Sequence, residues 1–272
     1  MIINALKAPT ARTAGEHIRG WRQRRRLSQL NFALDAEISQ KHLSFIESGR
    51  STPSRDMVLR LAEHLKVPLR ERNVMLLAAG YAPVFAERSL DDPALQAARA
   101  AIDLVLKGHE PFPAIAIDRH WTLIAANASV PAILAMVNDA SLVQPPVNVL
   151  RLSLSPGGLA PHIINLAEWR THLLDRLRQQ IEVTADVRLE ALLRELLAFP
   201  VAVSDTAGQG QKNYAGVLIP MQLRTPAGIL SFFSTTTVFG TPTDITLSEI
   251  ALEAFFPADA ATAEALRLAA NS

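Results

Sequence analysis

Apolar residues, serine caps and terminal glycines in the first 80 residues predict a series of short helices. The expected helices cover residues 16–25, 28–36, 39–49, 53–65 and 69–79. Serines stand at the start of the second and third segments, and glycines follow the third and fifth. These are preferred residues at helix N-termini and just beyond helix C-termini. The pattern predicts an all-α domain of five helices within residues 1–86.

The pattern changes after a linker-like stretch. A connecting segment over residues 87–107 contains a helix that starts at Asp92 and Pro93, and residues 108–272 form the expected second domain. Short runs with strand character cover 114–118, 121–125, 216–223 and 228–238, and helical runs cover 129–137, 161–180 and 184–198. The sequence Thr246-Leu-Ser-Glu249 has the form of a capping box and predicts a last helix toward Phe256. This order predicts an α+β domain with an antiparallel sheet.

Charge is distributed unevenly along the chain. Residues 1–80 carry 14 Lys and Arg against 7 Asp and Glu, a net charge of +7, whereas the remainder carries −6. A basic domain attached to an acidic one is typical of a nucleic-acid-binding module joined to another function. There is no cysteine, no apolar run of the roughly 18 residues that span a bilayer, and no hydrophobic leader at the N-terminus. We therefore expect a cytoplasmic protein with no membrane association.

Residues 29–48 have the pattern of a helix-turn-helix motif. Small or apolar residues occupy the positions where two crossing helices meet, namely Phe32, Ala33, Ala36, Ile38, Leu43 and Ile46. Two helices joined by a short turn can present the second helix to the major groove of DNA. Together with the adjacent basic helix, this motif predicts sequence-specific binding to a duplex operator.

The stretch QLNFALDAEISQKHLSFIES and the residues after it resemble the Xre-type family of phage-repressor-like helix-turn-helix proteins. Glu47, Gly49 and Pro53 hold positions typical of that family. The resemblance implies that Arg22 pairs with Glu47 in a structural ion pair. The chain departs from the family pattern at the turn. Glu37 occupies a position that is often glycine in the family and that commonly has a positive φ.

The geometry of such motifs assigns roles to the polar residues. The leading candidates for base reading are Gln40, Lys41 and Ser44, near the start of the recognition helix, which Ser39 caps. Phe45 has two interpretations, contact with a thymine methyl group or packing in the core. Ser28 and Gln29 are expected near a phosphate. The arginines expected to contact the DNA backbone are Arg24, Arg25, Arg26 and Arg50.

Over essentially its whole length, the chain resembles the MmyB-like transcription regulators. The segments that carry this resemblance are LRERNVMLLAAGYAP, IDRHWTLIAANA, INLAEWRTHLLDRL and SFFSTTTVFGTPTDITLSEIALEAFFPAD. The resemblance implies an Xre-type domain followed by a PAS-like ligand-binding domain, in which helices on an antiparallel sheet leave a pocket. A fatty-acyl or other small apolar ligand is the expected occupant.

Residues of two kinds are candidates for ligand binding. Apolar candidates lie on the predicted strands: Ile115, Ile117, Trp121, Ile124, Ile229, Phe232 and Phe233. Each of these has ordinary core packing as its alternative. Trp169, Arg170 and His172 lie on one predicted helix, where Arg170 or His172 could hold a carboxylate. A surface or core-edge role is the alternative for these two.

The residues also bear on whether the protein is an enzyme or binds a metal. The seven histidines show no metal-ligand spacing, and no nucleophile motif or phosphate-binding glycine loop is present. We expect no catalytic residues, no metal and no cofactor. The main interpretation is a homodimeric regulator that senses a small ligand. The alternative is a regulator or antitoxin-like module whose C-terminal domain binds a protein partner.

Overall fold

The computed structural model describes residues 12–200, 219–240 and 242–270. The chain divides into two compact units. The first runs to Glu87 and also includes Thr243–Ile245, and the second contains the rest. This boundary lies one residue beyond the predicted one. The helix expected in the connecting segment belongs to the second unit, where it packs on the sheet.

Five helices form the first unit, as predicted. They are α1 (Ala14–Arg24), α2 (Gln29–Asp35), α3 (Gln40–Glu47), α4 (Arg55–His64) and α5 (Leu69–Ala78). The side-chain oxygens of Ser28, Ser39 and Ser54 accept hydrogen bonds from backbone N–H groups in the first turns of α2, α3 and α4. These caps satisfy donors that have no partner within a helix, which fixes where each helix begins.

The core of the first unit is apolar, and two of its helices approach closely. Its fully buried side chains include Ile18, Phe32, Leu43 and Leu61. A Cβ atom added at Gly15 of α1 would lie 2.1 Å from the carbonyl oxygen of Ile46 in α3. Because no side chain fits in that space, glycine permits the contact between α1 and α3.

A short segment from late in the sequence completes the first unit. Asp244 and Ile245 are almost fully buried. The backbone N–H of Ile245 donates to the carbonyl oxygen of Ala86 at 2.8 Å, and Ala86 and Asp244 form a parallel bridge. The end of the helical unit is thereby paired with residues from near the C-terminal end of the sequence.

The second unit is built on one antiparallel sheet of five strands in the order β2-β1-β5-β4-β3. The strands are β1 (Ala114–Ile117), β2 (Leu123–Ala126), β3 (Met221–Thr225), β4 (Gly228–Val238) and β5 (Ala251–Pro257). The central strand is β5, which pairs with β1 on one side and with β4 on the other. Residues far apart in the sequence therefore meet at the centre of this unit.

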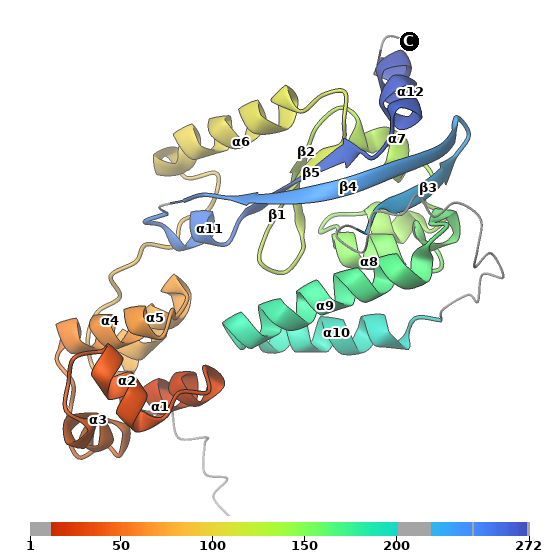
Figure 1. The fold of residues 1–272 in the computed structure, drawn as a ribbon. Coiled ribbons are helices and arrows are strands. Elements are labelled where there is room, and N and C mark those ends of the chain that lie inside the picture. The colour runs from red at the N-terminus through yellow and green to blue at the C-terminus, as the bar shows by residue number, and fades with distance from the viewer. Residues whose placement is uncertain (1–11, 201–218, 241, 271–272) are drawn as a thin grey trace, which may run out of the picture. The chain divides into compact units, whose positions relative to one another are not determined.

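Helices cover both faces of the sheet (Figure 1). One face packs on α6 (Gln96–Gly108), which follows the 3₁₀ turn Pro93–Leu95. The other face packs on α7 (Val130–Leu134), α8 (Val149–Leu154), α9 (Leu166–Thr184) and α10 (Val187–Ala198). Two further 3₁₀ turns cover Ala140–Val143 and Ala160–His162. Alternate residues of β1 face opposite layers, with Ile115 and Ile117 toward α8–α10 and Ala114 and Ala116 toward α6.

The predicted α+β class with an antiparallel sheet is confirmed, but the prediction for the C-terminal segment is wrong. The capping-box pattern opens only a single turn, α11 (Ile245–Ser248), and the chain then forms β5 in place of the expected longer helix. Pairing with two neighbouring strands outweighs the local helix signal, because β5 fills the centre of the sheet. A further helix, α12 (Ala260–Ala270), follows it. Strand β3 begins at Met221, and residues 216–218 of the predicted strand lie outside the described residues.

Candidate functional site

Helices α2 and α3 form the helix-turn-helix motif. Five of the six predicted contact residues are buried, and Ile38 in the turn is partly buried. Glu37 has a φ of 53°, which confirms the left-handed conformation expected at the turn. This conformation is strained for a residue with a Cβ atom, at a cost of roughly 1 kcal/mol. The packing of the two helices holds the turn in place.

A buried ion pair supports the motif from behind. The Nε and Nη2 groups of Arg22 donate to the two carboxylate oxygens of Glu47 at 2.6 and 2.8 Å. The Gln29 side-chain amide donates to the same carboxylate at 2.8 Å, and Arg22 also donates to the carbonyl oxygen of Leu27. The hydrogen bonds to Glu47 raise the pKa of the Arg22 guanidinium above its usual value, although burial opposes this. The pair links α1, the start of α2 and the end of α3.

The residues proposed to read bases lie at the start of α3. Ser39, Gln40 and Lys41 are exposed, and Ser44 is half-buried. Phe45 is also half-buried, and its ring lies 5.7 Å from the Lys41 ammonium and 5.9 Å from the Arg50 guanidinium. Phe45 is therefore a partly exposed ring close to two cations. Contacts of these α3 residues with DNA bases remain a prediction.

The four arginines predicted to contact the DNA backbone differ in their surroundings. Arg24, Arg26 and Arg50 are exposed. Arg25 is half-buried. Its Nε donates to the carbonyl oxygen of Leu65 at 2.9 Å, its Nη2 donates to that of Lys66 at 3.2 Å, and its guanidinium lies over the ring of Trp21. Arg25 therefore anchors the C-terminal end of α4.

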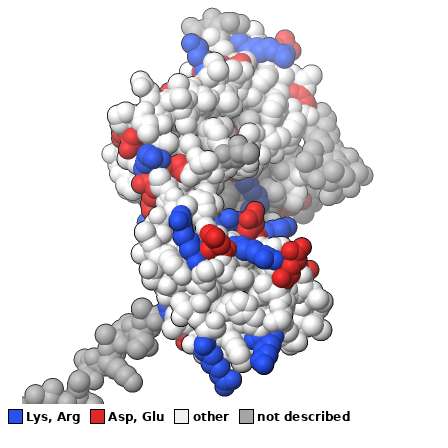
Figure 2. Space-filling model, turned by 90° about the vertical axis from the view of Figure 1, so that its left-hand side faces the viewer, with Lys and Arg blue, Asp and Glu red and all other residues white. Residues whose placement is uncertain are grey.

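The two residues at the start of α2 also have partners within the unit. The Ser28 hydroxyl oxygen caps the helix, and the Gln29 amide is bound to Glu47. Ser28 is exposed, so it remains accessible to a phosphate. In Figure 2, the lower end of the molecule carries separate Lys and Arg side chains among residues drawn in white. An exposed set of cations on a weakly charged surface is suited to contact with phosphates.

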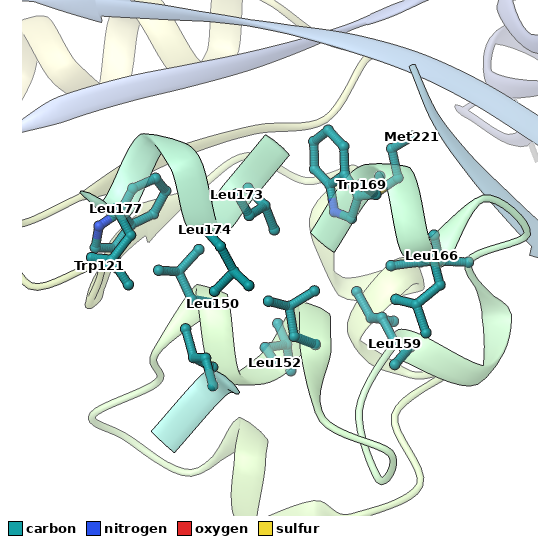
Figure 3. Close-up of a cluster of buried hydrophobic side chains, with 14 of the residues drawn as sticks. Trp121, Leu150, Leu152, Leu159, Leu166, Trp169, Leu173, Leu174, Leu177 and Met221 are labelled. Carbon is teal, nitrogen blue, oxygen red and sulfur yellow. The ribbon is translucent and has the colours of Figure 1, made fainter. Parts of the chain in front are cut away.

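The second unit contains an apolar cavity between the sheet and helices α7–α9. Its volume is about 90 Å³, which leaves room for several water-sized groups. The cavity is lined by Pro113, Ile115, Trp121, Leu123, Val130, Ile133, Leu134, Val149, Leu150, Leu152, Ser153, Leu159, Trp169, Leu173, Met221, Phe232, Glu253 and Phe255. Figure 3 shows side chains of α8 and α9, including Leu150, Leu152, Trp169 and Leu173, gathered together beneath the strands. A concave apolar site with few polar groups is typical of a small-molecule pocket.

Four of the predicted ligand-binding residues line this cavity, namely Ile115, Trp121, Trp169 and Phe232. The other apolar candidates lie elsewhere. Ile117 is buried in the core on the same face, and Ile124 packs with the cluster on the α6 face. Ile229 is 60% exposed. The ring of Phe233 stacks on Phe256 at a centroid distance of 5.3 Å.

Neither basic candidate is among the residues that line the cavity. The Nη2 of Arg170 donates to the carbonyl oxygens of Leu196 and Leu197 at the end of α10, at 2.8 and 3.0 Å. The His172 ring lies against Trp169 with 5.4 Å between centroids. Burial lowers the pKa of His172, and the positive charge of Arg176 lowers it further. The structure therefore places Arg170 at the end of α10 and His172 against one residue of the lining, and neither side chain lines the cavity itself.

Sequence reasoning missed most of the helical lining and the two polar residues of the cavity, Ser153 and Glu253. The Ser153 hydroxyl oxygen accepts a hydrogen bond from the Trp169 indole at 3.0 Å. The Glu253 carboxylate accepts one from Arg176 at 2.5 Å and is only 4% exposed. A single carboxylate within the apolar run ALEAFFP was the available signal, because a lone charge in a buried strand requires a specific partner.

The described part of the chain contains neither a cluster of metal-ligating side chains nor a helix able to span a membrane. Within residues 12–200, 219–240 and 242–270, no group of three or more His, Asp or Glu side chains is placed to hold a metal ion. None of the helices in those same ranges combines the length and apolar character needed to cross a bilayer.

Two family models match the sequence. Residues 18–72 match a helix-turn-helix family, which covers the motif described above. Residues 98–269 match the MmyB-like transcription regulator ligand binding domain, which covers the sheet, its helices and the cavity. No curated protein matches the sequence. The second match alone covers more than half of the chain and the two occur in the order expected of such a regulator, so the chain belongs to the MmyB-like family of helix-turn-helix transcription regulators.

Proposed function

We propose that this protein reads a DNA operator through α3 and changes its affinity for that operator when a small apolar ligand fills the cavity of its second unit. The apolar cavity is the observation that carries the ligand-sensing part of this proposal. It lies in the unit that matches a ligand-binding domain, and 16 of its 18 lining residues are apolar. A fatty-acyl or other small apolar ligand, as the family resemblance implies, is the ligand class proposed here. Both matched families belong to DNA-binding regulation, and we propose no catalytic activity.

The proposed assembly on DNA is a homodimer in the cytoplasm. A single helix-turn-helix unit contacts only a few base pairs, which is too few to identify one operator in a genome. Two units related by two-fold symmetry would read half-sites about 34 Å apart, or a multiple of that distance. We place the dimer contact in residues 108–272. Mass photometry of the full chain, alone and with operator, tests this proposal, and a complex with one chain per operator contradicts it.

Ligand control of DNA binding requires that the ligand favour one DNA-binding state of the protein over another. The change in operator affinity cannot exceed that preference, which is typically 1–3 kcal/mol in allosteric proteins. We therefore expect a filled cavity to change the operator Kd by a factor of about 5 to 150.

Binding of the neutral apolar dye N-phenyl-1-naphthylamine to the full chain tests the cavity. Leu134→Trp should fill part of the cavity and weaken dye binding at least several-fold. Ala132→Trp is the matched control, because Ala132 is exposed on the same helix and does not line the cavity. Dye fluorescence that is absent from the wild-type protein, or equal in both variants, would contradict ligand sensing. That result would favour a protein partner for the second unit.

A further inference from the structure

We propose that the polar head of the ligand is a neutral hydrogen-bond donor, such as a hydroxyl group, that donates to Glu253, and that a free carboxylate is selected against. This inference rests on the proposed ligand-binding function and specifies its ligand class.

Glu253 lies in the middle of the central strand β5. Its neighbours Leu252 and Ala254 face away from the cavity, whereas Glu253 and Phe255 belong to the cavity lining. The carboxylate is therefore held at the cavity by the central strand of the sheet, which is paired on both sides. Its Oε1 accepts the hydrogen bond from Arg176, and among the described residues no donor is bound to its Oε2. One acceptor oxygen at the cavity wall is thus available to a ligand.

Arg176 neutralises Glu253 but is held away from the ligand. Its Nη2 donates to Glu253 at 2.5 Å and to the Thr236 hydroxyl at 3.0 Å. Its guanidinium lies 4.9 Å from the centroid of the Trp121 ring, and that ring is itself part of the cavity wall. Arg176 is not among the residues that line the cavity. These three contacts fix the guanidinium behind the wall, where it balances the buried charge.

The cavity offers little to a ligand carboxylate. The described residues of its lining include no Lys, Arg or His. Both indole N–H groups of the lining are used within the protein, since Trp121 donates to Gln180 at 2.7 Å and Trp169 donates to Ser153 at 3.0 Å. A buried carboxylate without a cation or several donors is strongly disfavoured, and the nearby Glu253 adds repulsion between like charges.

A charged amine is disfavoured for a related reason. The negative charge of Glu253 is already balanced by Arg176, so an ammonium group would bring an unbalanced positive charge into an apolar space. A hydroxyl group adds no charge. It can donate to the Oε2 of Glu253 while its alkyl chain contacts the leucines of α8 and α9.

Displacement of N-phenyl-1-naphthylamine from the full chain tests the inference. The competitors are 1-decanol, decanoate and decylamine, which share one chain length and differ in their head group, each used below its critical micelle concentration. We expect 1-decanol to compete at least ~10-fold more strongly than decanoate or decylamine. Glu253→Gln should reduce the preference for 1-decanol over decanoate by about 10-fold, because an amide supplies donors and the change releases Arg176. Glu264→Gln, at an exposed glutamate of α12, should retain the wild-type order.

The outcomes distinguish a failure of the inference from a failure of the proposed function. Decanoate that competes as well as 1-decanol on the wild-type protein overturns the inference and leaves the ligand-binding function intact. An unchanged preference in folded Glu253→Gln also overturns it. A dye that does not bind the wild-type protein contradicts the proposed function itself. If Glu253→Gln does not fold, the order of the three competitors on the wild-type protein decides the question alone.

Discussion

Arg22 and Glu47 form a bidentate ion pair inside the helical unit, although 24 residues separate them in the sequence. The pair distances are 2.6 and 2.8 Å, and the two side chains are 10% and 2% exposed. Because Glu47 ends α3 and also accepts from Gln29 at the start of α2, its carboxylate links the end of α3 to both α1 and α2. The pair therefore holds α3 in position within the helical unit.

Removal of one partner of this pair should destabilise the helical unit. Glu47→Gln or Arg22→Met leaves the other group buried without its partner, which typically costs about 3–5 kcal/mol. The two changes together should cost less than their sum. Hydrogen exchange of peptides from α1–α5 in the full chain measures this, with peptides of α9 as internal reference. The exposed pair Arg60–Glu37, at 3.2 Å, is the control and should contribute at most about 1 kcal/mol. Additive losses at Arg22 and Glu47 would refute the coupling.

The turn of the motif offers a stabilising substitution. Glu37 has a φ of 53°, a conformation that glycine adopts without steric cost. Glu37→Gly should therefore raise the free energy of unfolding of the helical unit by up to about 1 kcal/mol, after correction for the lost contact with Arg60. Glu37→Ala removes the same contact and should give no such gain. Hydrogen exchange of α2 and α3 compares the two variants, and equal protection would show that the turn is unstrained.

Arg25 and Arg26 should differ in their effect on DNA binding, although they are adjacent. Arg26 is exposed, so Arg26→Ala should reduce the slope of log K against log salt by about 0.9 if it contacts a phosphate. Arg25 donates to the last carbonyls of α4, so Arg25→Ala should lower hydrogen-exchange protection there. Arg188→Ala, at an exposed arginine of α10, is the charge-matched control. If Arg188→Ala reduced the slope of log K against log salt as much as Arg26→Ala does, the phosphate contact assigned to Arg26 would be contradicted.

The stability of the second unit should depend on pH through His172. Burial and the charge of Arg176 lower its pKa in the folded protein, whereas in the unfolded chain it titrates near 6.5. The unfolded chain therefore gains a proton first, and stability that is present above pH 6.5 is lost as the pH falls below that value. The melting temperature of the wild-type protein relative to His172→Gln should fall between pH 7.5 and 5.5. A constant difference over this pH range would show that His172 titrates alike in both states.

The sequence is most informative where structure depends on local signals. The five helices of the first unit follow from caps, glycine stops and apolar spacing, because their ends are satisfied by neighbouring side chains such as Ser28 and Ser39. The ion pair and the positive φ of Glu37 follow from a family pattern. The strand β4 was also predicted with its observed bounds.

Prediction fails where long-range pairing decides the outcome. The segment Ala251–Pro257 has no strict alternation of apolar and polar residues, because both faces of β5 are covered. One of its two partner strands, β1, lies more than 100 residues away in the sequence, so no local pattern identifies this segment as the central strand. The same reason explains the missed cavity residues, since Glu253, Ser153 and Leu150 are brought together only by the tertiary fold.

The central claim is that α3 reads a specific DNA sequence. The most direct measurement is the Kd of the full chain for an operator selected from random duplexes, compared with a scrambled duplex at the same salt concentration. We expect the operator to bind at least ~10³-fold more tightly. Gln40→Ala and Lys41→Ala should each lose about 1–3 kcal/mol on the operator and little on the scrambled duplex. Equal affinity of the wild-type protein for both duplexes, or equal losses on both in the variants, would contradict the claim.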